Sequence, residues 1–202
     1  MEEDITLYSD ASSEIGAGAW LTFGNEEVYK KGFIRWTSEE FYMFRKQKLT
    51  KLNNDETGVS INVLEFFAVV YFVLIWRHEL KGYIVRTNCD NSATVSWLAR
   101  MCACGKSPVS EALMKLFAVV CLKFDIRIIS YHLPGIFNVY ADFLSRDVFL
   151  QELPSIIEDI GERQWWRGQS AEVISRNFLL RCIIQPSTLP SNDLLNLLET
   201  LQ

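Results

Sequence analysis

The chain has 202 residues, of which 49% are hydrophobic and 13% aromatic, and a formal net charge of −5. This length and composition allow one globular domain with a substantial core and exclude a disordered chain. Residues 1–146 carry 16 basic and 17 acidic side chains, whereas residues 147–202 carry 4 and 8. The first part is nearly neutral and the second is acidic, so any nucleic-acid binding must rest on local patches or bound cations.

The cysteines indicate reduced thiols. There are five of them, with no paired spacing and no signal-peptide pattern ahead of them. We therefore expect an intracellular protein, cytoplasmic or nuclear. The two histidines and the absence of a CxxC pair argue against zinc. The most apolar run, residues 63–76, is too short to span a bilayer, which needs about 20 apolar residues.

In chain order, apolar alternation first predicts three strands, at residues 4–12, 16–23 and 27–36, joined by short turns into an antiparallel meander. Residues 37–60 are polar and irregular, and we interpret them as an insertion or long connection. The apolar residues 61–80 then predict a buried helix that is ended by Gly82.

Strands and helices alternate in the rest of the predicted domain. A strand at residues 83–90 precedes a helix that begins near Asn91 or Ser92, and a second helix runs from Pro108 to about Lys123. A strand at residues 125–132 leads through a Pro-Gly loop to a last helix, for which Asn138 is the expected N-cap. The order β-β-β-α-β-α-α-β-α indicates an α/β architecture, a mixed sheet flanked by helices.

Residues 148–202 differ in character and predict a helical C-terminal extension. A capping-box pattern starts at Pro154, and Ser191 precedes a leucine-rich segment. We expect this extension to pack against the core or a partner through Trp165, Trp166 and the leucines of that last segment.

Four carboxylates stand in apolar surroundings: Asp10, Glu65, Asp90 and Asp142. Such groups are costly to ionise alone, and are more easily explained if they meet and share divalent cations. Oxygen ligands suit Mg²⁺ or Mn²⁺ rather than zinc, and two such ions about 4 Å apart are the apparatus of phosphodiester hydrolysis. Each aspartate alone also has a structural explanation, as a turn cap, a helix N-cap or a partner of a helix dipole. Glu65, inside a very apolar helix, is the hardest to explain structurally.

The order of these residues resembles the ribonuclease H family. The resemblance rests on "LYSDASSEIGAGAWL", "INVLEFFAVV", "VRTNCDNSATVSWL" and "HLPGIFNVYADFLSR", and the last segment is the most specific. Among such domains the chain looks most similar to those of retrotransposon reverse transcriptases of the DIRS type, which carry a tyrosine recombinase. The resemblance covers about residues 4–147, which gives a ribonuclease H-like domain at residues 1–147 and the extension at 148–202.

The resemblance implies a ribonuclease H-like mixed five-stranded sheet flanked by helices. It implies a metal-dependent endoribonuclease that hydrolyses the RNA strand of RNA:DNA hybrids during retroelement reverse transcription, beside a polymerase domain in cis or in trans. Asp10, Glu65, Asp90 and Asp142 would be catalytic ligands of two Mg²⁺ or Mn²⁺ ions, and His132 a loop residue aiding proton transfer or product release. The chain departs from the pattern in the long segment 37–60 and in Cys89, which stands directly before Asp90.

Substrate would be held by two kinds of group. Ser12 and Asn91 are short polar donors beside the carboxylates, suited to the 2′-hydroxyls of the RNA strand. The basic run "RKQKLTK" would contact phosphates through Arg45, Lys46, Lys48 and Lys51, unless it is an ordinary solvated loop. The alternatives to a ribonuclease are a catalytically silent docking or spacer module in a reverse-transcriptase assembly and, less favoured, another nuclease of this fold such as an integrase or resolvase.

Overall fold

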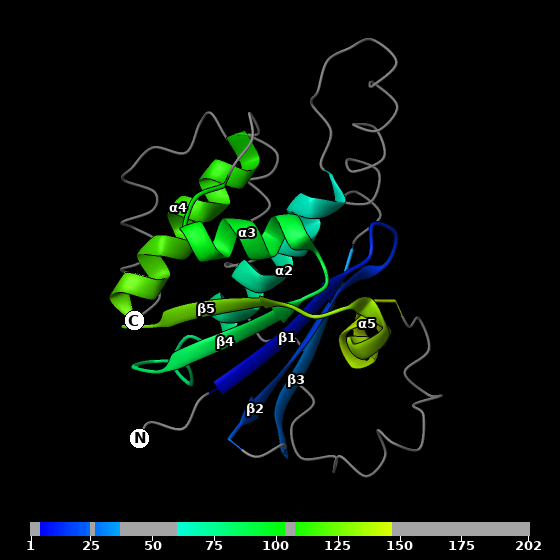
Figure 1. The fold of residues 1–202 in the computed structure, drawn as a ribbon, viewed down its shortest axis with the longest axis horizontal. Helices are drawn as coiled ribbons and strands as arrows, with labels where there is room; N and C mark the ends of the chain where they lie inside the picture. Colours follow the sequence, from blue (N-terminus) through cyan, green and yellow to red (C-terminus); the bar gives the residue numbers. More distant parts are fainter. Residues whose placement is uncertain (1–4, 25–26, 37–59, 104–107, 147–202) are drawn as a thin grey trace.

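The computed structural model describes residues 5–24, 27–36, 60–103 and 108–146. Within these residues the chain forms one five-stranded sheet with the strand order β3-β2-β1-β4-β5 (Figure 1). The predicted insertion, apart from its last residue, and the predicted helical extension lie outside the described residues.

The first three strands form the predicted antiparallel meander. They are β1 (Ile5–Ala11), β2 (Gly16–Phe23) and β3 (Glu27–Arg35). On its other side, β1 pairs in parallel with β4 (Ile84–Cys89), which pairs in parallel with β5 (Arg127–His132). The mixed sheet is therefore confirmed, with its three parallel strands side by side.

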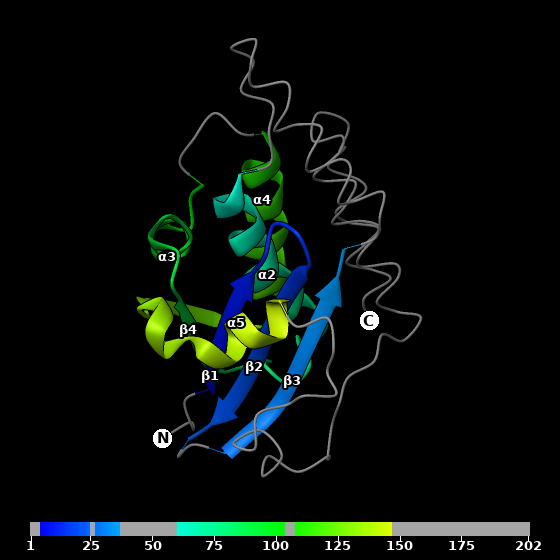
Figure 2. The same ribbon diagram turned by 90° about the vertical axis from the view of Figure 1, so that its right-hand side faces the viewer.

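Helices cover both faces of the sheet. Figures 1 and 2 show α2 (Ile61–Ile75), α3 (Ser92–Arg100) and α4 (Pro108–Lys123) on one face and α5 (Val139–Arg146) on the other. Pro108 begins α4, as predicted. The prediction that the buried helix extends to residue 80 is wrong, because α2 ends at Ile75 and the chain turns back toward β4 through hydrogen-bonded turns.

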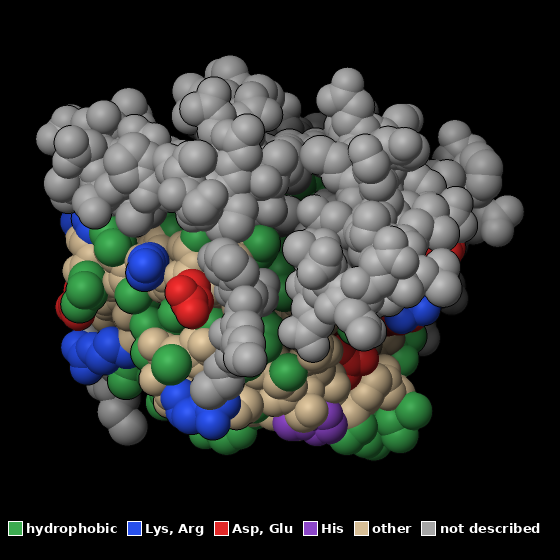
Figure 3. Space-filling view, turned by 90° about the horizontal axis from the view of Figure 1, so that it is seen from above, with side chains coloured by type: hydrophobic (Ala, Val, Ile, Leu, Met, Phe, Trp, Pro, Cys, Tyr) green, Lys and Arg blue, Asp and Glu red, His purple; other side chains and the backbone are tan. Residues whose placement is uncertain are grey.

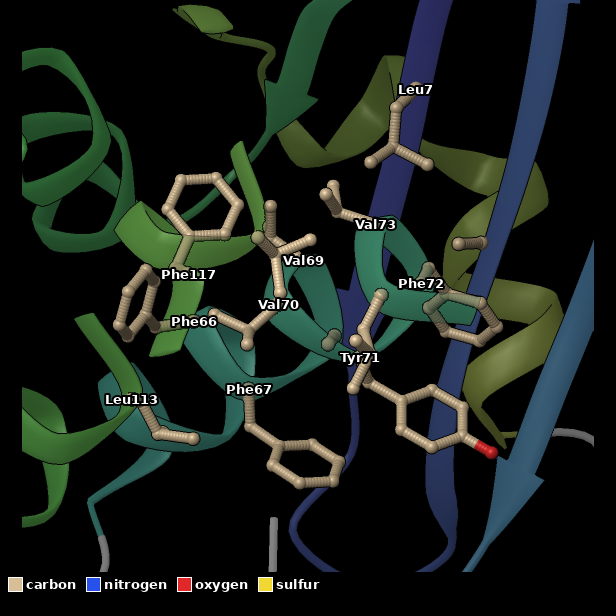
Figure 4. Close-up of a cluster of buried hydrophobic side chains, with 14 of the residues drawn as sticks. Leu7, Phe66, Phe67, Val69, Val70, Tyr71, Phe72, Val73, Leu113 and Phe117 are labelled. Carbon is tan, nitrogen blue, oxygen red and sulfur yellow. The ribbon is translucent and has the colours of Figure 1, made fainter. Parts of the chain in front are cut away.

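Helix α2 is the centre of the core. All its residues from Val63 to Leu74 are buried, because α4 covers one side of it and the sheet the other. Figure 4 shows its side chains between Leu7 of β1 and Phe117 of α4. A helix enclosed on all sides needs no polar stripe, which explains its continuous apolar run. No helix in the described part of the chain has both the length and the apolar character needed to cross a membrane.

Helix α5 packs directly on the opposite face, over β1, β2 and β3. A Cβ atom on Gly18 would lie 2.3 Å from Leu144 Cβ, so the glycine is required for this close approach. Arg35 Nη1 donates to the Leu144 carbonyl oxygen at 2.7 Å. Trp20 stacks on Tyr8 and meets the ring of Tyr140 edge-on. These contacts fix the position of α5 against the strand that carries Asp10.

Candidate active site

The strand order brings three of the predicted site residues to one edge of the sheet. Strands β1, β4 and β5 are parallel, so their carboxyl ends lie at the same edge. Asp10 is the penultimate residue of β1, Asp90 directly follows β4, and His132 ends β5. Ligand sites of sheets with parallel strands are commonly built at this edge.

Glu65 reaches the edge from α2 and is 4% exposed. Its carboxylate accepts a hydrogen bond from the Ala11 backbone N–H, and its Oε2 lies 3.8 Å from the thiol sulfur of Cys89. Burial, followed by the negative charges of Asp10 and Asp90, raises the pKa of Glu65 from 4.5 to about 9. Without a cation this carboxyl is therefore protonated at neutral pH.

Asp10 is 1% exposed and points toward α5. Ser145 Oγ donates a hydrogen bond to Asp10 Oδ2 and also lies 2.9 Å from the Asp142 carbonyl oxygen. Its one hydrogen can serve either oxygen, and both arrangements join the end of β1 to α5. Burial is the main reason that the pKa of Asp10 rises from 3.8 to about 6. The hydrogen bond from Ser145 and the positive charge of Arg146 lower this pKa, whereas the negative charges of Asp90 and Asp142 raise it.

Asp90 is half-buried and is enclosed by the loop that follows β5. Burial and the charge of Asp142 raise its pKa. His132 Nε2 lies 3.0 Å from the Asp90 carbonyl oxygen. Because a carbonyl oxygen only accepts, Nε2 carries the proton in this hydrogen bond and Nδ1 is the ring atom that can take up another. A Cβ atom on Gly135 would lie 3.0 Å from Asp90 Oδ2, so any larger residue there would require the Asp90 carboxylate to shift.

Asp142 stands in the first turn of α5, and 44% of its side chain is exposed. Its Oδ1 lies 2.6 Å from Nε of Arg146, one helical turn later. Since Asp142 raises the pKa of both Asp10 and Asp90, it shares one electrostatic environment with them. The structure thus brings all four predicted carboxylates together, three of them enclosed and Asp142 at the solvent side.

The donor set fits a divalent cation. The tightest group comprises Glu65, Cys89 and Asp90, whose candidate ligand atoms all lie within 4.8 Å of one another. Carboxylates that raise one another's pKa repel when ionised, and a bound cation would remove this repulsion. Carboxylate oxygens are the ligands that Mg²⁺ and Mn²⁺ prefer.

The two predicted 2′-hydroxyl contacts lie near this site but already have partners. Ser12 Oγ accepts from the backbone N–H groups of Glu14 and Ile15, both at 3.3 Å, which leaves its O–H available as a donor. Asn91 Oδ1 accepts from Thr94 N–H at 3.0 Å, and its Nδ2 donates to Asn62 Oδ1 at 2.8 Å. Asn91 is therefore the N-cap of α3, and Asp90 is not. The binding of substrate by Asn91 stays a prediction.

The predicted phosphate contacts, Arg45, Lys46, Lys48 and Lys51, lie outside the described residues. On the face shown in Figure 3, the Lys and Arg side chains of the described residues are scattered and form no single basic patch.

Two residues near the site have roles that the sequence did not reveal. Asn138 directly precedes α5, as predicted, and its carbonyl oxygen accepts from the Asp142 N–H at 3.0 Å. Its side chain does not cap the helix, because its Nδ2 donates to the Ser9 carbonyl oxygen at 2.9 Å and its Oδ1 has no hydrogen-bond partner. Asn138 instead ties the Pro-Gly loop to β1. Ser145, inside the segment "ADFLSR", holds Asp10. The sequence indicated a role for Asn138 and Ser145 only because both lie in "HLPGIFNVYADFLSR", the segment that resembles the ribonuclease H family. Their hydrogen-bond partners are more than 100 positions away in the chain.

Comparison with known structures supports the assignment of the fold. LC11-RNase H1, a protein isolated from compost and solved in complex with an RNA/DNA hybrid, superposes with a TM-score of 0.51 at 16% identity, over 69% of this chain and 92% of that one. RNase H1 from the halophilic archaeon Halobacterium salinarum NRC-1 gives a TM-score of 0.51 at 16% identity, over 70% and 93%. No protein-family model matches the sequence, and no curated protein matches it significantly. The described part of the chain therefore has a ribonuclease H-like fold.

Proposed function

We propose that this chain is a metal-dependent endoribonuclease that hydrolyses the RNA strand of RNA:DNA hybrids. The observation that carries the proposal is the meeting of Asp10, Glu65 and Asp90, with Asp142 beside them, at the carboxyl edge of a ribonuclease H-like sheet. A silent module has no need for buried carboxylates that repel one another. Such an arrangement destabilises the metal-free fold, and it is explained if function requires a cation there.

Glu65, Asp10, Asp90 and Asp142 would hold the Mg²⁺ or Mn²⁺ ions, two by analogy with phosphodiesterases of this chemistry. Bound cations would neutralise charge on the scissile phosphate and lower the pKa of the attacking water. The protein's part is to fix the carboxylates: Ala11 N–H orients Glu65 and Ser145 orients Asp10. Rigid carboxylates define where the phosphate can sit.

His132 stands at the rim of this site, where we assign it to proton handling. Its ring is exposed and its Nε2–H is held by the Asp90 carbonyl oxygen, so Nδ1 is left as the proton-accepting atom. A positioned imidazole can protonate the leaving 3′-oxygen or assist product release. Among the described residues, His132 is not part of the group of candidate metal ligands formed by Glu65, Cys89 and Asp90.

Substrate class is inferred from the site and supported by the neighbour that was solved with an RNA/DNA hybrid. Ser12 lies in the turn after β1, two residues beyond Asp10, and we assign its hydroxyl to a contact with a 2′-hydroxyl of the RNA strand. We assign the biological context, reverse transcription of a retroelement beside a polymerase domain, from the sequence resemblance alone.

The test is a cleavage assay with matched RNA:DNA hybrid, double-stranded RNA and double-stranded DNA, each with Mg²⁺, Mn²⁺ or chelator. We expect metal-dependent cleavage of the RNA strand of the hybrid only. Asp10→Asn should abolish cleavage and leave the circular dichroism spectrum unchanged, because Asn can still accept from Ser145. Exposed Glu111→Gln on α4 is the matched control and should cleave normally. Chelator-resistant cleavage, or full activity of Asp10→Asn, would refute the proposal.

A further inference from the structure

An exposed hydrophobic segment borders the carboxylate site and has no part in the proposed reaction. Among the described residues, nine large hydrophobic side chains are exposed. Five of these nine fall within residues 129–139: Ile129, Tyr131, Ile136, Phe137 and Val139. This segment runs from β5 through the Pro-Gly loop to the start of α5. Exposed apolar side chains that gather in one place indicate an interaction surface.

The backbone of this segment is held in place. Leu133 N–H donates to the Cys89 carbonyl oxygen at 3.0 Å, and Phe137 N–H donates to the Pro134 carbonyl oxygen at 2.8 Å. The side chain of Asn138 ties the loop to β1. A fixed backbone thus presents the exposed side chains to solvent, which reduces the entropy lost when a ligand binds to them.

The β5 part of the segment adjoins an exposed area of the sheet. Ser130 Oγ donates to a carbonyl oxygen of α3 at 2.9 Å, which places Ser130 on the face that carries α2, α3 and α4. Strand alternation therefore puts Arg127, Ile129 and Tyr131 on the opposite face, where α5 packs over β1, β2 and β3. There, Arg86 of β4 lies over the ring of Tyr131, with its Cζ 5.4 Å from the ring centroid. We call this area the β4–β5 face.

The side chains of the β4–β5 face suit a single strand of nucleic acid. Six side chains of β4 and β5 lie on this face, none of them acidic: Ile84, Arg86, Asn88, Arg127, Ile129 and Tyr131. Unpaired bases stack on aromatic rings and on guanidinium planes, and arginine also contacts phosphates. Arg127 Nε lies 3.9 Å from Asp125 Oδ1, but both side chains are well exposed, so this ion pair is weak and Arg127 stays accessible to a phosphate.

We propose that the β4–β5 face and the adjoining loop bind single-stranded DNA, with bases stacked on Tyr131 and Phe137 and a phosphate held by Arg127. His132 directly follows Tyr131, so a strand that leaves the carboxylates reaches this face first. Hydrolysis of the RNA strand of a hybrid leaves an unpaired DNA strand at this edge, and the face holds it there. The choice of DNA rests on the proposed function, whereas the binding of an unpaired strand does not.

Binding is measured by fluorescence anisotropy, with the full chain, chelator and a labelled oligothymidine of about 15 nucleotides. Tyr131→Ala and Phe137→Ala should each weaken binding by about five- to a hundredfold, because stacking is worth about 1–3 kcal/mol per base. Tyr131→Phe keeps the ring and should bind as wild type does. The matched control is Tyr29→Ala on β3, the opposite edge strand, because Tyr29 is 45% exposed and Tyr131 48%.

Two further arms separate stacking from charge. An abasic strand of the same length has the same phosphates and no bases, and it should bind at least about fivefold more weakly. Arg127→Ala should reduce the slope of log affinity against log salt by about 0.7, the value for one phosphate of a single strand. Circular dichroism and urea unfolding verify that each variant is folded.

Equal binding of the abasic strand, unchanged affinity in Tyr131→Ala or Phe137→Ala, or an equal loss in Tyr29→Ala overturns the inference. A wild-type chain that binds no oligothymidine also overturns it, and assigns the exposed segment to a protein partner instead. The measurement uses neither metal nor hybrid, so it decides the inference even if the chain cleaves no hybrid. Conversely, metal-dependent cleavage of the hybrid without oligothymidine binding would overturn this inference alone.

Discussion

Replacing Glu65 by Gln should stabilise the metal-free protein, and the gain should grow with pH. In the folded chain the pKa of Glu65 is raised from 4.5 to about 9, first by burial and then by Asp10 and Asp90. A raised pKa means that the folded state binds the proton more tightly, so stability is full below pH 4.5 and is lost as pH rises toward 9. Glutamine keeps the shape without an ionisable group, and so escapes this loss.

The magnitude follows from the pKa shift. Between pH 4.5 and 9 the loss is about 1.4 kcal/mol for each pH unit, which gives about 3 kcal/mol at pH 7 and under about 1 kcal/mol at pH 5. The side chain is 4% exposed, so solvent screening removes little of this. Exchanging the carboxyl group for an amide also changes stability by an amount that is the same at every pH. The informative quantity is therefore the slope, against pH, of the difference in unfolding free energy between Glu65→Gln and wild type.

The assay is urea unfolding of wild type and Glu65→Gln with chelator at pH 5, 6, 7 and 8. The control is Glu111→Gln, which removes a carboxylate exposed to solvent on α4. Saturating Mg²⁺ should then stabilise wild type, by about 2.7 kcal/mol at a hundredfold excess over Kd, and Glu65→Gln much less. A free-energy difference that stays flat from pH 5 to 8 would show that Glu65 ionises without penalty, and would refute the enclosed carboxylate site.

Three further predictions concern the loop, the helix contact and substrate binding. His132→Ala should lower kcat while the Mg²⁺ concentration for half-maximal activity stays the same; an equal loss of metal affinity would make it a ligand. Gly18→Ala should reduce the free energy of unfolding by about 1–3 kcal/mol in urea, because the new Cβ overlaps α5, and normal stability would contradict that packing. Changing Lys46, Lys48 and Lys51 to Ala should weaken hybrid binding and flatten its salt dependence, from a slope of about two to four. Identical slopes in wild type and triple variant would show that these lysines do not contact phosphate.

Local patterns in the sequence predicted most of the elements and drew attention to the candidate carboxylates. Period-two alternation identified the strands, and the continuous apolar run identified α2 as a helix enclosed by the core. A glutamate inside such a run is so costly that its neighbours had to include other polar groups, which pointed to the carboxylates. The end of α2 at Ile75 was missed, because buried Trp76 and Leu80 lie four positions apart and so continue the spacing of a helical face.

Only the tertiary structure decided which atoms touch. Ser145 meets Asp10 across 135 positions of the chain and Asn138 meets Ser9 across 129, and no local rule links such pairs. The sequence marked Cys89 only as a departure from the family pattern, and the structure shows its sulfur 3.8 Å from Glu65 Oε2 on β4, the strand paired with β1. Periodicity predicts which residues share a face of a strand or helix. The residues that this face contacts are determined by the strand register and by the position of each helix on the sheet. The sequence by itself therefore determined the carboxylates, and the packing of α2 and α5 on opposite faces determined the thiol, hydroxyl and amide groups that surround them.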